Sequence, residues 1–266
     1  MNFDFTSEQE QLRDSVRRVL AGYYAFEKRQ ALLTAGQPHD RRAWQQLAEL
    51  GLLGLMVPEE DGGFGGTTVD GLVVLEEMGR VLALEPFIGS AILAPRLLAT
   101  SDDTAVRQRY LAALVEGREI IVPALFEPGS RYSPVVRETS ARRDGDGWRL
   151  SGRKAMVTDG PCADRFLVAA RLQDSGTTAL FCIAADTPGL VRHNFRSHDG
   201  QGLSDLIFEN AALPAGALLS SDSDLADRLE DCRDLAAAAV CFEAVAEGQR
   251  RVIEIAGADG NVANAK

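Results

Sequence analysis

Residues 147–164, GWRLSGRKAMVTDGPCAD, decide the fold class expected for this chain. The DGDG run at 144–147 is a strong hairpin signal, and short β-branched or aromatic runs on both sides are separated by turn residues. The expected strands are 120–125, 138–142, 148–151, 153–158, 166–171, 178–184, 190–194 and 204–208. So many short strands in succession predict a small barrel or sandwich rather than βαβ units.

The chain on either side of these strands has a helical period instead. Thr6 with Gln9 fits a capping box at the start of one helix, and Asp40 is placed to cap another. Gly117 is placed to end the last helix before the strands, and the helical period returns from about residue 225. The sequence therefore predicts helices, then strands, then one more helix.

These patterns predict an α+β fold with four parts. They are an all-α N-terminal domain at 1–118, a small β domain at 119–220, the first helix of an incomplete C-terminal helical domain at 221–256, and a disordered tail at 257–266.

Composition excludes several classes of function. The chain has 266 residues, 45% of them apolar, and a net charge of −11 with no long basic run, so nucleic acid and anionic membranes are poor partners. The N-terminus is acidic where a secretory signal is basic and apolar, and no apolar run reaches membrane-spanning length. We expect a soluble cytoplasmic protein.

Cysteine and histidine spacing indicates neither disulfides nor a metal. The four cysteines are far apart and form no CxxC pair, which favours reduced thiols. The three histidines lack the spacing of metal ligands. We therefore assign no metal site.

Three short motifs lie in the predicted β region. A Glu127-Pro128 turn is followed by Gly-x-Lys-x-x-x-Thr at 152–158 and then by Gly-x-x-Ala-Asp at 160–164. In this order, and between two helical regions, they resemble the acyl-CoA dehydrogenase family. The resemblance runs from about residue 2 to 255 and is closest to the small subunits of heteromeric enzymes such as pimeloyl-CoA dehydrogenase. It also implies that the family's C-terminal helical domain is absent from this sequence.

The resemblance implies FAD as cofactor, bound by this chain alone or together with a partner chain. The residues that it implies at the flavin are Leu125, Phe126, Glu127, Ser130, Met156, Val157 and Thr158. Backbone groups of the first three and the Ser130 hydroxyl would contact the polar edge of the ring, and residues 156–158 would cover one face. Phe126 replaces a family threonine and Met156 replaces a family aromatic residue.

The family's chemistry requires a carboxylate that removes the substrate's α proton while a hydride passes to the flavin. The sequence identifies no catalytic base, so whether the chain is itself an enzyme stays open. Cys232-Arg233 stands where some family branches carry Glu-Arg. Glu243 and Glu247 lie on the last predicted helix, but nothing in the sequence indicates that they point inward.

Three functions follow from the resemblance. The first is an FAD-dependent acyl-CoA dehydrogenase subunit, acting in fatty acid or sterol degradation. The second is a non-catalytic or half-site partner subunit in a heteromeric dehydrogenase. The third is a flavin oxidase or monooxygenase on the same scaffold. In each case we expect an oligomer, either of this chain or with another acyl-CoA dehydrogenase-like subunit, and an acyl-CoA thioester is the implied substrate of the first.

One lysine in the motif has both a catalytic and a structural interpretation. Lys154 could be a Schiff-base lysine, but it lies in a predicted strand beside Arg153, which favours a solvated charge. For Thr158, an ordinary strand threonine and a flavin contact are about equally favoured.

Overall fold

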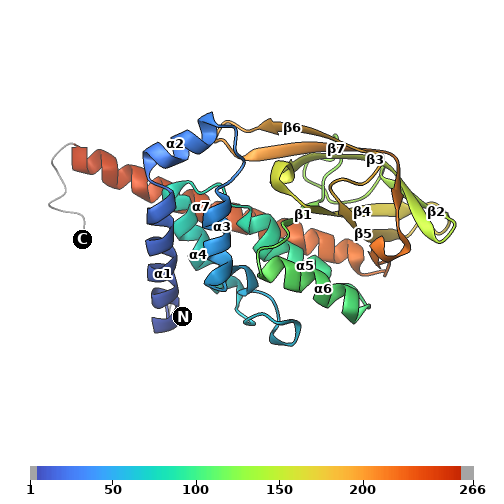
Figure 1. Cartoon of the computed structure of the whole chain (residues 1–266), viewed down its shortest axis with the longest axis horizontal. Coiled ribbons are helices and arrows are strands. Elements are labelled where there is room, and N and C mark those ends of the chain that lie inside the picture. Colours follow the sequence, from blue (N-terminus) through green and yellow to red (C-terminus); the bar gives the residue numbers. More distant parts are fainter. Residues whose placement is uncertain (1–4, 259–266) are drawn as a thin grey trace.

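The computed structural model describes residues 5–258, and in the last helix it describes side chains as far as residue 246. Figure 1 shows a block of helices beside a sheet, with one long helix, α7, passing both. The predicted order of helices, strands and a trailing helix is confirmed. From residue 259 onward, the tail expected at 257–266 lies outside the described residues.

The helical block begins with the predicted capping box. The backbone N–H of Gln9 donates to Thr6 Oγ1 at 3.2 Å, and the N–H of Thr6 donates to Gln9 Oε1 at 3.1 Å. Its elements are α1 (Ser7–Tyr23), α2 (Phe26–Thr34), α3 (Arg41–Glu49), 3-10 turns at Leu52–Gly54 and Glu59–Asp61, α4 (Thr68–Val81), the π-helix η3 (Phe87–Leu93), α5 (Ala94–Leu98) and α6 (Thr104–Val115).

Two of these helices differ from the sequence-based expectation. α2 was not predicted, and it buries none of its side chains, so its sequence has no apolar stripe to reveal it. Residues 86–98, within the region expected to be helical, form η3 followed by α5 rather than one regular helix. Pro95 has no N–H to bond to the carbonyl four residues earlier, which accounts for a widened turn before it.

The β domain is one mixed eight-stranded sheet. Its strands are β1 (Ile121–Ala124), β2 (Ser140–Asp144), β3 (Gly147–Thr158), β4 (Arg165–Leu172), β5 (Thr178–Ala184), β6 (Leu190–Arg196), β7 (Gly202–Leu213) and β8 (Leu218–Ser220). The order is β6-β7-β3-β2-β4-β5-β8, with β1 pairing parallel to β4. The short strand β8 was not predicted.

The two strands expected at 148–151 and 153–158 are one strand, β3, interrupted by bulges. At Gly152 φ is +135°, and a Cβ there would lie 2.5 Å from the Cα of Thr139. Glycine is therefore required because another backbone segment passes close to it. A second irregularity lies between Lys154 and Val157, where Met156 has φ +55°.

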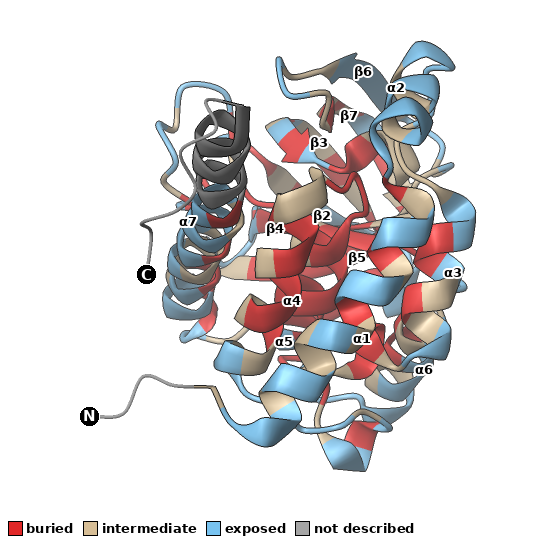
Figure 2. Cartoon of the chain, turned by 90° about the vertical axis from the view of Figure 1, so that its left-hand side faces the viewer, coloured by how far each residue is buried: buried red, intermediate tan, exposed pale blue. Residues whose placement is uncertain are grey.

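One apolar core joins the helical block to the sheet. Figure 2 shows buried residues concentrated between the helices and the strands behind them. Phe87 of η3, Val122 of β1 and Phe166 of β4 belong to the same cluster. The sheet is therefore held against the helices by apolar packing.

The long helix α7 (Leu225–Ala258) crosses α4 at very close range. A Cβ added at Gly79 would lie 2.2 Å from the carbonyl oxygen of Glu243. Only glycine lets the two helices approach this closely. The crossing fixes where Glu243 stands on the inner side of α7.

Replacing Gly79 with alanine should therefore destabilise the protein. We expect Gly79→Ala to cost about 1–3 kcal/mol, because the new methyl group forces α4 and α7 apart. Gly22→Ala is the matched control, since no atom lies within 4 Å of a Cβ at that position in α1. The control should be slightly more stable than the wild type, because alanine has a higher helix propensity than glycine. Urea unfolding of both variants measures the difference, and equal midpoints would contradict the close crossing.

Candidate functional site

The structure brings together the two segments that the motifs singled out. The backbone N–H of Ala155 donates to the carbonyl of Phe126 at 2.9 Å. The ammonium of Lys154 lies 3.4 Å from the carbonyl oxygen of Leu125. The loop after β1 and the strand β3 are therefore neighbours, although they are some thirty residues apart in sequence.

Lys154 is not the solvated charge that the sequence favoured. Its side chain is 0% exposed and pairs with Glu127, with 3.4 Å between Nζ and Oε1. Side chains alternate between the two faces of a strand, so exposed Arg153 gives no guide to its neighbour. Burial lowers the pKa of Lys154 to about 8, while the Glu127 carboxylate opposes that shift.

Glu127 organises the chain around it. Its carboxylate accepts the backbone N–H groups of residues 137, 138 and 139, each at 2.9 Å, as well as the Lys154 contact. Burial alone would raise the pKa of Glu127, but these N–H groups and the lysine charge more than offset it and lower the pKa to about 2. The Glu127 carboxylate is bonded within the fold, so only the backbone of this residue is available to a ligand.

The three motif residues at the end of β3 point in different directions. Met156 is 55% exposed, and its backbone N–H donates to Asp205 Oδ1 at 2.9 Å. Val157 belongs to the core, whereas Thr158 is exposed. Met156 and Thr158 are thus the two side chains of this segment that are open to a ligand.

The other predicted site residues lie at the start of the loop after β1. Leu125 is buried, Phe126 is half-buried and Ser130 is half-buried. The Phe126 ring meets the Tyr132 ring edge to face, with centroids 5.8 Å apart. An apolar surface with backbone groups and one hydroxyl therefore adjoins β3.

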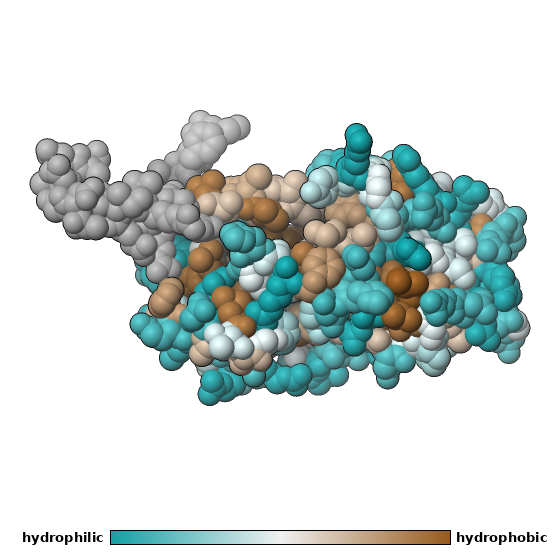
Figure 3. Space-filling view, turned by 90° about the horizontal axis from the view of Figure 1, so that it is seen from above, coloured by the Kyte–Doolittle hydropathy of each residue, from teal (hydrophilic) through white to brown (hydrophobic). Residues whose placement is uncertain are grey.

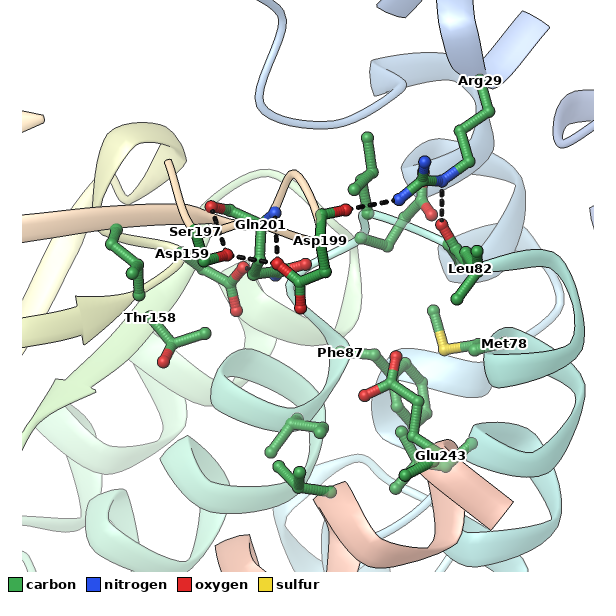
Figure 4. Close-up of a pocket in the computed structure, with 18 residues that line it drawn as sticks. Arg29, Met78, Leu82, Phe87, Thr158, Asp159, Ser197, Asp199, Gln201 and Glu243 are labelled. Atoms are coloured by element: carbon green, nitrogen blue, oxygen red, sulfur yellow. Dashed lines mark hydrogen bonds between the residues drawn. The ribbon is translucent and has the colours of Figure 1, made fainter. Parts of the chain in front are cut away.

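Thr158 opens onto a cavity of about 320 Å³ between the helices and the sheet (Figure 4). The cavity is lined by Arg29, Leu75, Met78, Leu82, Ala83, Leu84, Glu85, Phe87, Ile88, Thr158, Asp159, Ser197, Asp199, Gln201, Leu203, Val240, Glu243 and Ala244. Ten of these residues are apolar, and the other eight are polar or charged, four of them acids. Figure 3 shows several patches of apolar side chains on the face seen from above, among a largely hydrophilic surface.

Four carboxyl groups line this cavity, those of Glu85, Asp159, Asp199 and Glu243, and sequence analysis did not find the arrangement. Asp159 is buried and accepts a hydrogen bond from Gln201 Nε2. Burial raises the pKa of Asp159 to about 7, and the charges of Glu243 and Glu85 add to the shift. Burial likewise raises the pKa of Glu85 to about 7. Asp159 lies between two of the motifs and could have been noticed, but Glu85 has no local signal.

Glu243 projects from α7 into the cavity, on a different side from Thr158 (Figure 4). The sequence left its direction open, and the crossing at Gly79 determines it. Cys232 is buried on the same helix, where burial raises its pKa to about 11.

Within the described side chains, no group of His, Cys, Asp and Glu is suited to hold a metal ion. None of the helices between residues 5 and 258 is long and apolar enough to cross a membrane.

The sequence matches two parts of one known family. Residues 6–118 match the family described as "Acyl-CoA dehydrogenase, N-terminal domain", and residues 124–211 match "Acyl-CoA dehydrogenase, middle domain". The acyl-CoA dehydrogenase FadE27 of Mycobacterium tuberculosis is 34% identical over 192 residues, which cover 72% of this chain and 49% of that protein. The chain thus spans about half the length of this curated relative.

Solved structures of similar fold cover nearly all of this chain. The ChsE4-ChsE5 complex from Mycobacterium tuberculosis matches with a TM-score of 0.80 and 28% identity, over 90% of this chain and 64% of that one. Glutaryl-CoA dehydrogenase from Mycobacterium smegmatis matches with a TM-score of 0.82 and 26% identity, over 96% and 65%.

Breaking the buried pair should destabilise the protein strongly. We expect Glu127→Gln to cost about 3 kcal/mol or more, because it leaves the Lys154 charge buried without a partner. Since the folded-state pKa of Glu127 is lowered to about 2, its contribution is present above about pH 4.5 and is lost as pH falls toward 2.

Denaturant unfolding at neutral and acidic pH tests this expectation. The wild type should lose more stability than Glu127→Gln as the pH falls through that window. Asp144→Asn, which removes an exposed partner of Arg149, is the control and should leave the midpoint unchanged. A Glu127→Gln midpoint equal to that of the wild type would contradict the role assigned to the pair.

Proposed function

This chain belongs to the acyl-CoA dehydrogenase family, and on that premise we propose that it is an FAD-dependent subunit that dehydrogenates an acyl-CoA thioester between its α and β carbons. The observation that supports this most is the cavity itself, which the motif residue Thr158 and the carboxylate of Glu243 both line from different elements. The reaction needs a base at the α carbon and a hydride acceptor at the neighbouring β carbon.

The residues beside the cavity fit a flavin ring. Met156 offers an exposed apolar side chain, and the hydroxyls of Thr158 and Ser130 offer hydrogen bonds. Backbone groups of residues 125–127 lie alongside, since Ala155 is bonded to Phe126. Bound FAD would supply the hydride acceptor.

The chain's own contribution is binding, orientation and proton removal. The apolar walls formed by Leu75, Phe87 and Val240 would enclose the acyl group and exclude water from it. Glu243 would accept the α proton on a carboxylate oxygen. Among the acids that line the cavity it is the one that projects from α7, across the cavity from Thr158, and it is only half-buried, whereas Glu85 and Asp159 are buried.

A second candidate function is a half-site subunit that shares its flavin with a partner. Compared with the family pattern, Phe126 lacks the hydroxyl of a threonine and Met156 lacks an aromatic ring. Phe242 and Val245 on α7 are exposed apolar side chains available to another chain, and one similar structure is a ChsE4-ChsE5 complex. Under this function, the flavin would bind tightly only when an acyl-CoA dehydrogenase-like partner is present.

Flavin binding separates the two functions and tests Thr158. We expect the purified chain to show the visible absorbance of bound oxidised flavin, and Thr158→Ala to weaken FAD binding about tenfold through the lost hydroxyl. Thr178→Ala, at the start of β5, is the matched control and should bind FAD like the wild type. A folded but colourless chain that gains flavin only with a partner would favour the second function.

Removing the proposed base should slow the reaction. We expect Glu243→Gln to reduce the rate of flavin reduction by an acyl-CoA at least about 100-fold in anaerobic stopped-flow, because the amide cannot accept the α proton. Glu230→Gln is the control, since Glu230 lies on the same helix but pairs with Arg233 away from the cavity. Reduction of the Glu243→Gln protein at the wild-type rate would rule out this residue as the base.

A further inference from the structure

Arg29 is the one basic residue among the described residues that line the cavity. It belongs to α2, the helix that buries none of its side chains. Its Nε donates to the Leu82 carbonyl at the end of α4, and its Nη2 donates to the Asp199 carbonyl in the turn between β6 and β7, each at 2.7 Å (Figure 4). One side chain therefore joins three elements at the cavity wall.

Both carbonyls that hold the Arg29 guanidinium are fixed in place. The carbonyl of Leu82 follows the last residue of α4 and has no partner within that helix. The turn that carries Asp199 is closed by its own carboxylate, which accepts the Ser197 hydroxyl and the backbone N–H of Gln201. A guanidinium is a planar group with donors in a rigid fork, so two fixed acceptors define its position. The Arg29 guanidinium is thus a fixed part of the wall.

Arg29 and Thr158 lie on different sides of the cavity (Figure 4). Under the proposed function, the reacting carbons lie between Thr158 and Glu243. A complete CoA thioester is far larger than a cavity of about 320 Å³, so the acyl group is the part that fills it. The acyl chain beyond the reacting carbons then extends away from Thr158, toward Arg29.

We propose that Arg29 closes the far end of the cavity and thereby limits the length of the acyl group that this chain accepts. The inference rests on the proposed function, since it takes the ligand to be an acyl-CoA thioester. The end of an alkyl chain offers no group to pair with either carbonyl, so displacing the guanidinium would break two hydrogen bonds without replacing them. Arg29 is therefore a residue that determines specificity, and it takes no part in the chemistry.

The protein beyond Arg29 is open to solvent. Phe26 on α2 is 73% exposed, and Lys28 and Gln30 on either side of Arg29 are exposed as well. Removing the guanidinium should therefore open the end of the cavity toward the surface rather than leave a closed void. An acyl group too long for the wild-type cavity could then extend outward.

The test is a chain-length series on the FAD-loaded protein, assembled with its partner chain if flavin binding requires one. Straight-chain acyl-CoA thioesters from butanoyl to hexadecanoyl are titrated by calorimetry, with the flavin kept reduced so that none is dehydrogenated. In the wild type we expect affinity to rise about fourfold per methylene up to a limiting length and to fall beyond it. A wild type without such a limit would overturn the inference.

Replacing Arg29 should raise that limit. In Arg29→Ala we expect affinity to keep rising for at least about two more methylenes, so that those thioesters bind about tenfold or more tightly than to the wild type. An unchanged limit would overturn the inference. Should Arg29→Ala not fold, Arg29→Met decides in the same way, because it keeps an apolar stem but neither hydrogen bond.

Two control variants separate the guanidinium from the helix that carries it. Gln30→Ala changes the exposed neighbour on α2 and should keep the wild-type limit. Arg196 also ties α2 to the sheet, through the carbonyls of Leu33 at 3.3 Å and Gln37 at 2.8 Å, but does not line the cavity. Arg196→Ala should keep the limit too. A shift as large as that of Arg29→Ala would assign the limit to the position of α2 and overturn the role of Arg29.

The proposed function can fail separately from this inference. If acyl-CoA thioesters bind and reduce the oxidised flavin but the limit is the same with and without Arg29, the function stands and the inference falls. If no thioester of any length binds, both fall.

Discussion

The buried carboxylate of Glu127 is the constraint on which the rest of the site depends. It gathers three consecutive backbone N–H groups ahead of β2 and the ammonium of Lys154 on β3. Because a buried charge without a partner is costly, the loop and the strand keep their places together. Met156 and Thr158 follow within a few residues of that lysine, so the pair determines where the ligand-facing end of β3 lies.

The second constraint is the close crossing of α4 and α7. Gly79 lets α7 approach until the Glu243 backbone touches α4, and that approach turns the Glu243 side chain toward the cavity. The acid is thus positioned by a residue with no side chain at all. The two constraints are independent, since one fixes the sheet side of the cavity and the other fixes the helical side.

Local chemistry made much of the fold predictable, and distant contacts account for the rest. The Thr6–Gln9 capping box and the DGDG hairpin need only neighbouring residues, and both are found where the sequence predicted them. Gly152 suggested a break between two strands, but it is a bulge required by Thr139, which pairs from another segment. The prediction that Lys154 is a solvated charge was wrong for the same reason. Its partner Glu127 lies in another segment, which a local sequence pattern does not include. The acids of the cavity come from distant segments of the chain, among them Glu85, Asp159 and Glu243. No local motif could therefore predict the cavity.

The four acids that line the cavity have different environments. The charges of Glu243 and Glu85 both raise the pKa of Asp159, and burial raises the pKa of Asp159 and of Glu85 to about 7. Glu243 is less buried than either, and Asp199 is exposed. Burial would raise the pKa of Asp199, but hydrogen bonds from the Ser197 hydroxyl and the Gln201 N–H lower it. Different environments thus divide the same functional group between two tasks. A half-buried carboxylate such as that of Glu243 is suited to take a proton from carbon, whereas the buried carboxyls of Glu85 and Asp159 are held in place by Tyr24 and Gln201.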